Sequence, residues 1–169
     1  DPDSLDSIGA WRFYGKLNTT MSAHPKVDPI TGELLFHAYM VTGPFSDDMG
    51  LYRVNRSGHM TESQVFKAPY ASMVHDFVVT ENYIIFPVMP ITLSLERAMA
   101  GKPPVAWEPE LGTKVGVMPR NGTTADITWF DGDACYVFHF MNGRDRDGVI
   151  TMEACHFDSP PLFPMADGT

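Results

Sequence analysis

Short apolar runs separated by turn residues recur along most of this chain. The clearest case is an apolar run that begins at His75, reaches the turn sequence Thr80-Glu81-Asn82 and resumes up to Val88. That pattern indicates a β-hairpin with His75 at its mouth. Further β-like runs cover residues 34–41, 51–55, 64–68, 91–95, 114–118, 127–130, 135–140 and 149–157.

The polar stretches between these runs are mostly turns. Residues 143–148 predict a longer polar connection. The segment 94–100 alone has a helical pattern, about two turns ended by Gly101.

The pattern predicts an all-β fold of about nine or ten short strands, which means a sandwich, a barrel or a propeller. Strand-turn-strand units recur at roughly the 40 to 50 residues of a propeller blade, although no clean internal repeat is present. A chain of this size would hold about three or four blades. Because an incomplete propeller leaves an open sheet edge, and the chain begins without Met, we expect residues 1–169 to be a single partial domain of a longer protein.

Composition narrows the class of partner and the compartment. A net charge of −9 and a pI near 4.9 argue against nucleic acid and against an anionic membrane surface as partners. No apolar run approaches the roughly 20 residues that span a bilayer, and the acidic first residues are not a signal peptide. Two cysteines form no disulfide framework. We therefore expect a cytoplasmic protein, with peripheral membrane contact and oligomeric state left open.

Three of the six histidines are candidate metal ligands: His24, His75 and His139. They are far apart in the sequence, and each lies at the edge of a predicted strand or inside one. The inner strands of propeller blades line a common axis, so residues from separate blades can meet there. Neutral imidazole binds Fe, Zn, Cu and Ni, so the residue type does not select the metal. The alternative is that each is an ordinary hydrogen-bonded histidine of the core or the sheet edge.

The other histidines are expected to lie outside such a site. His37 alternates within its strand and is interpreted as structural, and His59 lies at a hairpin tip and is interpreted as solvated. His156 lies in a predicted strand beside Cys155, and we assign it no metal role.

Other reactive residues give weaker signals. Cys135 and His139 are four residues apart in a predicted strand, so their side chains would point to the same face and Cys135 could approach the site. A packed free thiol is nevertheless the favoured interpretation. Asp76 is interpreted as a local backbone partner and Glu81 as a turn residue. The sequence contains no phosphate-binding loop, nucleophile elbow or Cys-x-x-Cys pair.

Three motifs resemble the signatures of the carotenoid cleavage oxygenases, in that family's order. This family includes the bacterial lignostilbene dioxygenases and the isomerase of the retinal pigment epithelium. The resemblance runs from about residue 5 to about residue 155. The motifs are Ala23-His24-Pro25-Lys26-Val27-Asp28-Pro29 with Thr31-Gly32-Glu33-Leu34, then His75-Asp76-Phe77 with Thr80-Glu81-Asn82, and Phe138-His139-Phe140 with Asn142.

The resemblance implies the central part of a seven-bladed β-propeller with a non-haem Fe(II) on its axis, held by four histidines. The first three carry over to His24, His75 and His139. The fourth has no counterpart here, and the glutamates that hydrogen-bond the ligand imidazoles fall outside the stretch. This chain alone is therefore not expected to hold iron as the family does, and the fragment is expected to be inactive. In many members alanine follows the asparagine of the third motif, whereas this chain has Gly143.

The implied activity is a dioxygenase reaction, with O₂ as co-substrate and no organic cofactor. A conjugated C=C bond of a carotenoid, an apocarotenoid or a stilbene-like phenylpropanoid is split into two carbonyl products. The sequence Thr20-Met21-Ser22-Ala23-His24, together with the absence of a membrane-seeking stretch, favours the bacterial lignostilbene branch. The expected partner is thus a small hydrophobic or phenolic conjugated molecule. Two alternatives stay open: a non-catalytic propeller with structural histidines, and a family member that isomerises or mono-oxygenates its substrate.

Overall fold

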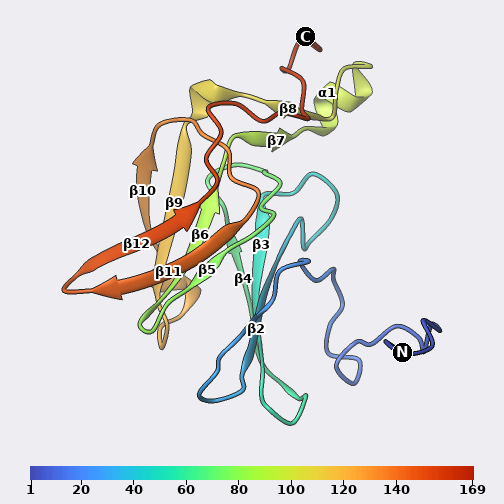
Figure 1. Cartoon of the computed structure of the whole chain (residues 1–169). Helices are drawn as coiled ribbons and strands as arrows, with labels where there is room; N and C mark the ends of the chain where they lie inside the picture. The colour runs from blue at the N-terminus through green and yellow to red at the C-terminus, as the bar shows by residue number, and fades with distance from the viewer.

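The computed structural model describes residues 1–169, and its regular structure is almost entirely β (Figure 1). Two sheets have four antiparallel strands each. The first has the order β1-β2-β3-β4 and the second the order β10-β9-β6-β5. The strands of the first sheet are β1 Lys26–Val27, β2 Leu34–Tyr39, β3 Asp48–Val54 and β4 Met60–Lys67, and those of the second are β5 Val78–Val79, β6 Tyr83–Val88, β9 Thr113–Pro119 and β10 Thr128–Gly132.

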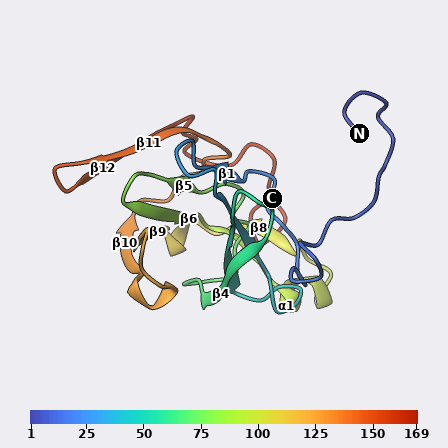
Figure 2. The ribbon, with the colours of Figure 1, turned by 90° about the horizontal axis from the view of Figure 1, so that it is seen from below.

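Two shorter sheets complete the fold. β7 Ile91–Leu93 pairs with β8 Val105–Trp107, and β11 Phe140–Arg146 pairs with β12 Val149–Ala154. The β7–β8 pair is an excursion between β6 and β9, which are neighbours in the second sheet. The N-terminal end of the chain extends away from the sheets in both views (Figures 1 and 2). The turn around Phe13 returns to the first sheet, where Phe13 is buried against Phe36 of β2 and Tyr52 of β3.

The two four-stranded sheets are joined by a shared apolar core. Leu35 and Leu51 of the first sheet pack in one cluster with Ile84 and Phe86 of the second, and Phe77 lies in the same cluster. All five side chains are fully buried. Burial of each such side chain contributes about 1.5–3 kcal/mol, so the cluster fixes one sheet against the other.

A separate apolar cluster lies under the segment that leads into β11. Tyr136 and Val137 are buried there with Met89, Ile91 and Trp107. This cluster holds the segment against β7 and β8 even though the segment pairs with no strand.

The helical content is small. α1 Leu95–Met99 begins after Ser94, whose hydroxyl accepts the backbone N–H of Arg97 at 3.2 Å, and it ends before Gly101, which has a φ of +69°. Short 3₁₀ turns occupy Pro109–Leu111 and Thr124–Asp126. None of these helices has the length and apolar character to cross a membrane.

The all-β prediction and most predicted strands are confirmed, and so is the helix. The strand predicted at residues 135–140 is wrong, because adjacent residues there, Tyr136 and Val137, are both buried and no ladder partner is present except one bridge to Phe157. The polar connection predicted at residues 143–148 is also wrong, since β11 continues to Arg146. β11 and β12 form a two-stranded ribbon with much of its surface exposed. Because β11 buries no face, its sequence lacks the alternation of apolar and polar residues that marks an ordinary strand.

Candidate metal centre

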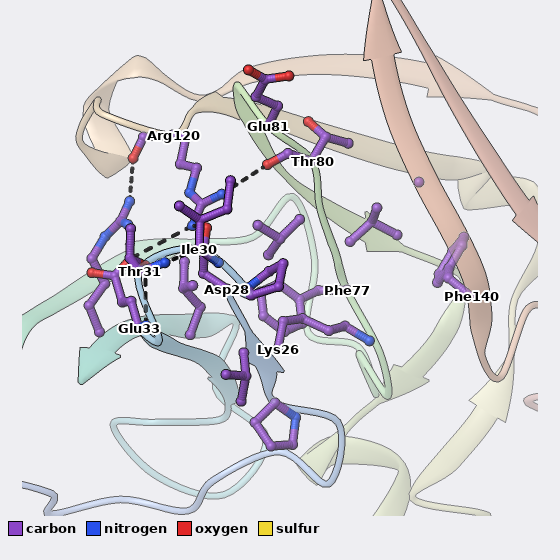
Figure 3. A pocket seen from close by; sticks show the side chains of 18 of the residues that line it. Lys26, Asp28, Ile30, Thr31, Glu33, Phe77, Thr80, Glu81, Arg120 and Phe140 are labelled. Carbon is purple, nitrogen blue, oxygen red and sulfur yellow. Dashed lines mark hydrogen bonds and ion pairs between the residues drawn. The ribbon is translucent and has the colours of Figure 1, made fainter. Parts of the chain in front are cut away.

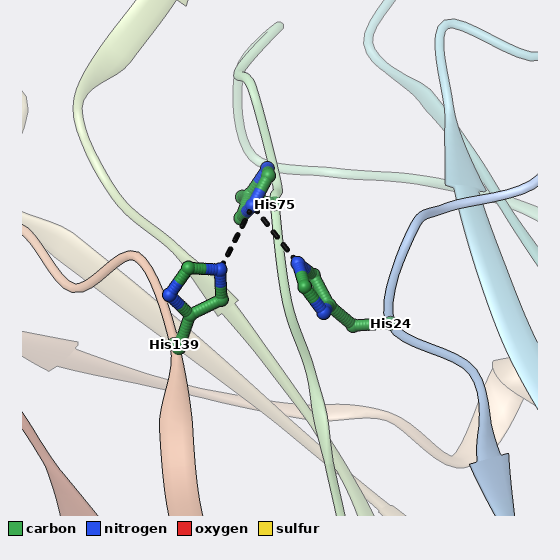
Figure 4. Close-up of side chains that lie close together, drawn as sticks. All are labelled: His24, His75 and His139. Atoms are coloured by element: carbon green, nitrogen blue, oxygen red, sulfur yellow. Dashed lines mark hydrogen bonds between the residues drawn. The ribbon is translucent and has the colours of Figure 1, made fainter.

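The imidazoles of His24, His75 and His139 meet at one point (Figure 4). Nε2 of His75 lies 3.0 Å from Nε2 of His24 and 3.3 Å from Nε2 of His139. The ligand atoms of all three residues lie within 4.8 Å of one another. These residues are 51 and 64 positions apart, so only the tertiary fold brings them together.

None of the three histidines lies in a strand, and each is held by its neighbours. The N–H of Ser22, two residues before His24, donates to the carbonyl of His37 at 3.0 Å. The carbonyl of Val74, the residue before His75, accepts from Nε2 of His37 at 2.8 Å. His139 directly precedes β11, after the buried residues Tyr136 and Val137.

The three nitrogens have the spacing of metal ligands. A metal ion about 2.1 Å from each nitrogen would hold two of them about 3.0 Å apart at a right angle and about 3.4 Å apart at the tetrahedral angle. The measured separations of 3.0 and 3.3 Å fall within that range. A neutral imidazole carries one N–H, so the three ring nitrogens cannot all satisfy one another, whereas one cation would engage every lone pair. The donor set therefore fits a metal ion.

The local electrostatics keep His75 in the form that binds metal. Burial lowers its pKa, and the neighbouring His24 and His139 lower it further, because an imidazolium there would face two other imidazoles. Neutral imidazole is the ligand form.

The other predicted histidines lie away from this centre. His37 is fully buried in β2, and burial lowers its pKa to about 4, as expected of a neutral structural histidine. The ring of His59 stacks on that of Tyr14 with centroids 5.0 Å apart, and His156 is exposed, with Nδ1 3.7 Å from Asp158. His37 and His59 agree with the interpretations made from the sequence, whereas His156 lies outside the predicted strand, because β12 ends at Ala154.

Cys135 does not approach the centre. Its Sγ lies 3.5 Å from the hydroxyl of Thr113 in β9, and both cysteines are free thiols. Cys135 and His139 were expected on the same face of a strand, but the segment between them is not a strand, so that expectation is wrong. Glu81 is exposed in the turn between β5 and β6, as predicted.

Asp76, predicted to be a local backbone partner, also bonds to two distant segments. Its carboxylate does accept the adjacent N–H of Phe77 at 2.8 Å, but it also accepts from Nζ of Lys26 at 2.8 Å and from the N–H of Phe140 at 2.9 Å. Burial alone would raise the pKa of Asp76, yet the hydrogen bonds from Lys26 and Phe140 outweigh it and leave the pKa below its usual range. The one signal in the sequence was a charged residue inside an apolar run.

Two cavities lie near the centre. The larger, about 940 Å³, is lined by the ion-paired residues Asp28, Arg53 and Arg120 and contains none of the three histidines (Figure 3). A smaller one, about 340 Å³ and mostly apolar, includes His75. The smaller cavity is the one in contact with the histidine cluster, and its side chains include those of Met21, Ala23, Tyr39 and Met40.

Comparison with known proteins shows one consistent relationship. The family model described as retinal pigment epithelial membrane protein matches residues 1–168. Isoeugenol monooxygenase from Pseudomonas putida is 42% identical over 166 residues, which are 97% of this chain and 35% of that protein.

Solved structures agree with this relationship. The crystal structure of Pseudomonas brassicacearum lignostilbene dioxygenase matches with a TM-score of 0.93 and 37% identity, covering 100% of this chain and 36% of that one. Cobalt-substituted Synechocystis apocarotenoid oxygenase matches with a TM-score of 0.81 and 25% identity, covering 99% and 36%. The prediction of a partial β-propeller agrees with these matches. The chain spans about a third of the length of these relatives.

Proposed function

This chain belongs to the retinal pigment epithelial membrane protein family, the carotenoid oxygenases, and on that basis we propose that it supplies three iron ligands of an Fe(II)-dependent oxygenase. The ligands are His24, His75 and His139. Residues 1–169 are then the central part of the propeller, and the fourth ligand comes from another part of the complete protein.

The convergence of the three Nε2 atoms is the observation that carries this proposal. All-imidazole ligation suits ferrous iron, and the relative that matches in a cobalt-substituted form is an apocarotenoid oxygenase. Bound ferrous iron would supply the activation of O₂ that oxidation of a C=C bond requires.

The residues around the cluster contribute position and a dry surface. Val74 and Ser22 tie the His75 and His24 segments to β2, so that the imidazoles face one another without a strand beneath them. Met21 and Met40 line the small cavity beside His75 and would keep water from the reacting double bond.

We favour a stilbene-like or phenylpropanoid substrate. Isoeugenol monooxygenase and lignostilbene dioxygenase, which are named for compounds of this kind, share 42% and 37% sequence identity with this chain. The apocarotenoid oxygenase shares 25%. The cleaved molecule would be a small phenolic compound with a conjugated C=C bond, and the products two carbonyl compounds.

The first test is the iron content of the complete protein purified without oxygen. We expect about one iron per polypeptide, the content of a single site held by four histidines. His75→Ala should lose that iron, and His156→Ala, which changes an exposed histidine away from the site, should keep it. Folded protein without iron after Fe(II) reconstitution would favour a non-catalytic propeller instead.

A second candidate is mono-oxygenation, which the 42% identity to isoeugenol monooxygenase favours. Isotopic labelling with ¹⁸O₂ separates the two reactions. Label in both carbonyl products identifies a dioxygenase. Label in one product, after correction for exchange with water, identifies a mono-oxygenase.

A further inference from the structure

Asp76 connects the three segments that carry the histidines. One oxygen of its carboxylate accepts from Nζ of Lys26 and from the N–H of Phe77, both at 2.8 Å. The other oxygen accepts from the N–H of Phe140 at 2.9 Å. Lys26 follows His24 by two residues, and Phe140 directly follows His139. One side chain thus bonds next to every candidate ligand.

This link matters because the histidines themselves lie outside the β-strands, and only the His24 and His75 segments are bonded to β2. His24, His75 and His139 all lie in irregular segments, and His139 is exposed. β5, which follows His75, has two residues, and β11 begins only after His139. The spacing of the imidazoles therefore depends on bonds between the segments.

The environment of Asp76 suits this task. The residue is 4% exposed, so its three hydrogen bonds are shielded from water. The Lys26 side chain runs past the ring of Phe77 toward the strand that carries Phe140 (Figure 3), with Nζ 5.7 Å from the ring centroid. A carboxylate offers acceptors only, and three donors face it. An asparagine in its place would turn an N–H₂ toward at least one of those donors.

We propose that Asp76 is a positioning residue of the metal centre: its carboxylate sets the relative placement of His24, His75 and His139 and so the affinity and geometry of metal binding. The inference rests on the proposed function, because it assigns Asp76 a role toward that same metal. Asp76 itself does not touch the metal, since its oxygens are taken up by Lys26, Phe77 and Phe140.

The test measures binding of Co(II) to the metal-free complete protein, by the visible absorption that the bound ion acquires. Asp76→Asn should weaken binding about 10-fold and should change the Co(II) spectrum. This is the lower end of the roughly 10–100-fold cost of losing a group hydrogen-bonded to a metal ligand, because Asp76 bonds to neighbours of the ligands and not to the imidazoles. Asp28→Asn is the matched control. Asp28 is also a shielded, ion-paired aspartate. It lies in the His24 segment, but its side chain bonds to Arg120 and to the N–H groups of Ile30 and Thr31 and reaches neither the His75 nor the His139 segment.

The outcomes separate the two proposals. Wild-type protein that binds no Co(II) refutes the proposed function. Wild-type protein that binds Co(II), with Asp76→Asn equal to Asp28→Asn in affinity and spectrum, refutes the role of Asp76. Loss of thermal stability in both variants, with a changed spectrum in Asp76→Asn alone, supports it, because a merely structural residue would not alter the ligand field.

Lys26 gives a second route if Asp76→Asn fails to fold. Lys26→Met removes the link to the His24 segment and leaves the bonds to Phe77 and Phe140 in place. We expect weaker Co(II) binding and a changed spectrum in Lys26→Met, and recovery of both in Lys26→Arg, which keeps the cation. Wild-type binding by Lys26→Met would overturn the proposal.

Discussion

Gly143 of β11 packs closely against Val78 of β5. The substitution Gly143→Ala adds one methyl group at this contact and tests how tightly the contact is packed. A Cβ built on Gly143 would overlap Cγ1 of Val78. Val78 is 4% exposed, and valine has few χ1 rotamers open to it. The methyl group of Val78 occupies the space that a Cβ at position 143 would need.

Two effects oppose each other in Gly143→Ala. Gly143 does not have a positive φ, so alanine fits its backbone and stabilises by about 0.4–1 kcal/mol through the unfolded chain. Overpacking of a filled interior costs about 1–3 kcal/mol. The overlap involves a buried, β-branched side chain, so the second effect is the larger. We expect a net loss of about 1–2 kcal/mol in the free energy of unfolding.

A double-mutant cycle tests the cause. Val78→Ala alone removes two buried methyl groups and should cost about 2 kcal/mol. In the double variant the new methyl group at position 143 enters the vacated space, so stability should exceed the sum of the single effects by about 1–2 kcal/mol. Gly132→Ala is the control, because a Cβ there would meet only Thr113, at 3.9 Å.

The assay is urea unfolding of the complete protein, followed by near-ultraviolet circular dichroism. We expect the Gly143→Ala midpoint to fall below that of the wild type and the Gly132→Ala midpoint to stay level or rise. If the losses of unfolding free energy in Gly143→Ala and Val78→Ala add up to that of the double variant within about 0.5 kcal/mol, the two side chains do not compete for the same space and the reasoning is refuted. A Gly143→Ala variant as stable as Gly132→Ala would refute it as well.

Three further predictions concern stability. His37 should make the protein acid-sensitive, because burial lowers its pKa from 6.5 to about 4, so the unfolded state binds a proton first as the pH falls. The stability that neutral His37 contributes is fully present above the pKa of the unfolded state and is lost as the pH falls below it. Between about pH 7 and about pH 5, the free energy of unfolding of the wild type should therefore fall by about 2 kcal/mol more than that of His37→Gln. Equal losses in the two proteins would contradict this. Ser94→Ala removes the acceptor for the Arg97 N–H at the start of α1 and should cost about 1 kcal/mol, and an unchanged unfolding midpoint would count against the cap. Removal of the metal by a chelator should lower the melting temperature of the complete protein, and added Fe(II) should restore it, because the site exists only in the folded state; no response in either direction would argue against a metal centre.

The sequence predicted the elements whose signals are local. The apolar run of β2 and the hairpin of β5 and β6 were recognisable because β2 and β6 bury consecutive residues, which makes continuous apolar runs, and turn residues separate those runs. α1 was recognisable from Ser94 and Gly101 at its ends. Local signals failed at residues 135–139, where the chain is held by burial of Tyr136 and Val137 and not by strand pairing.

The sequence by itself determined the all-β class and, through the three motifs, the identity of the candidate ligands His24, His75 and His139. Only the tertiary structure decided that their Nε2 atoms meet, because the contacts join residues 51 and 64 positions apart. It alone revealed that Asp76 bonds to Lys26 and Phe140. Hydrogen bonds that one buried carboxylate accepts from distant segments leave no periodic pattern in the sequence, so only the folded chain shows them.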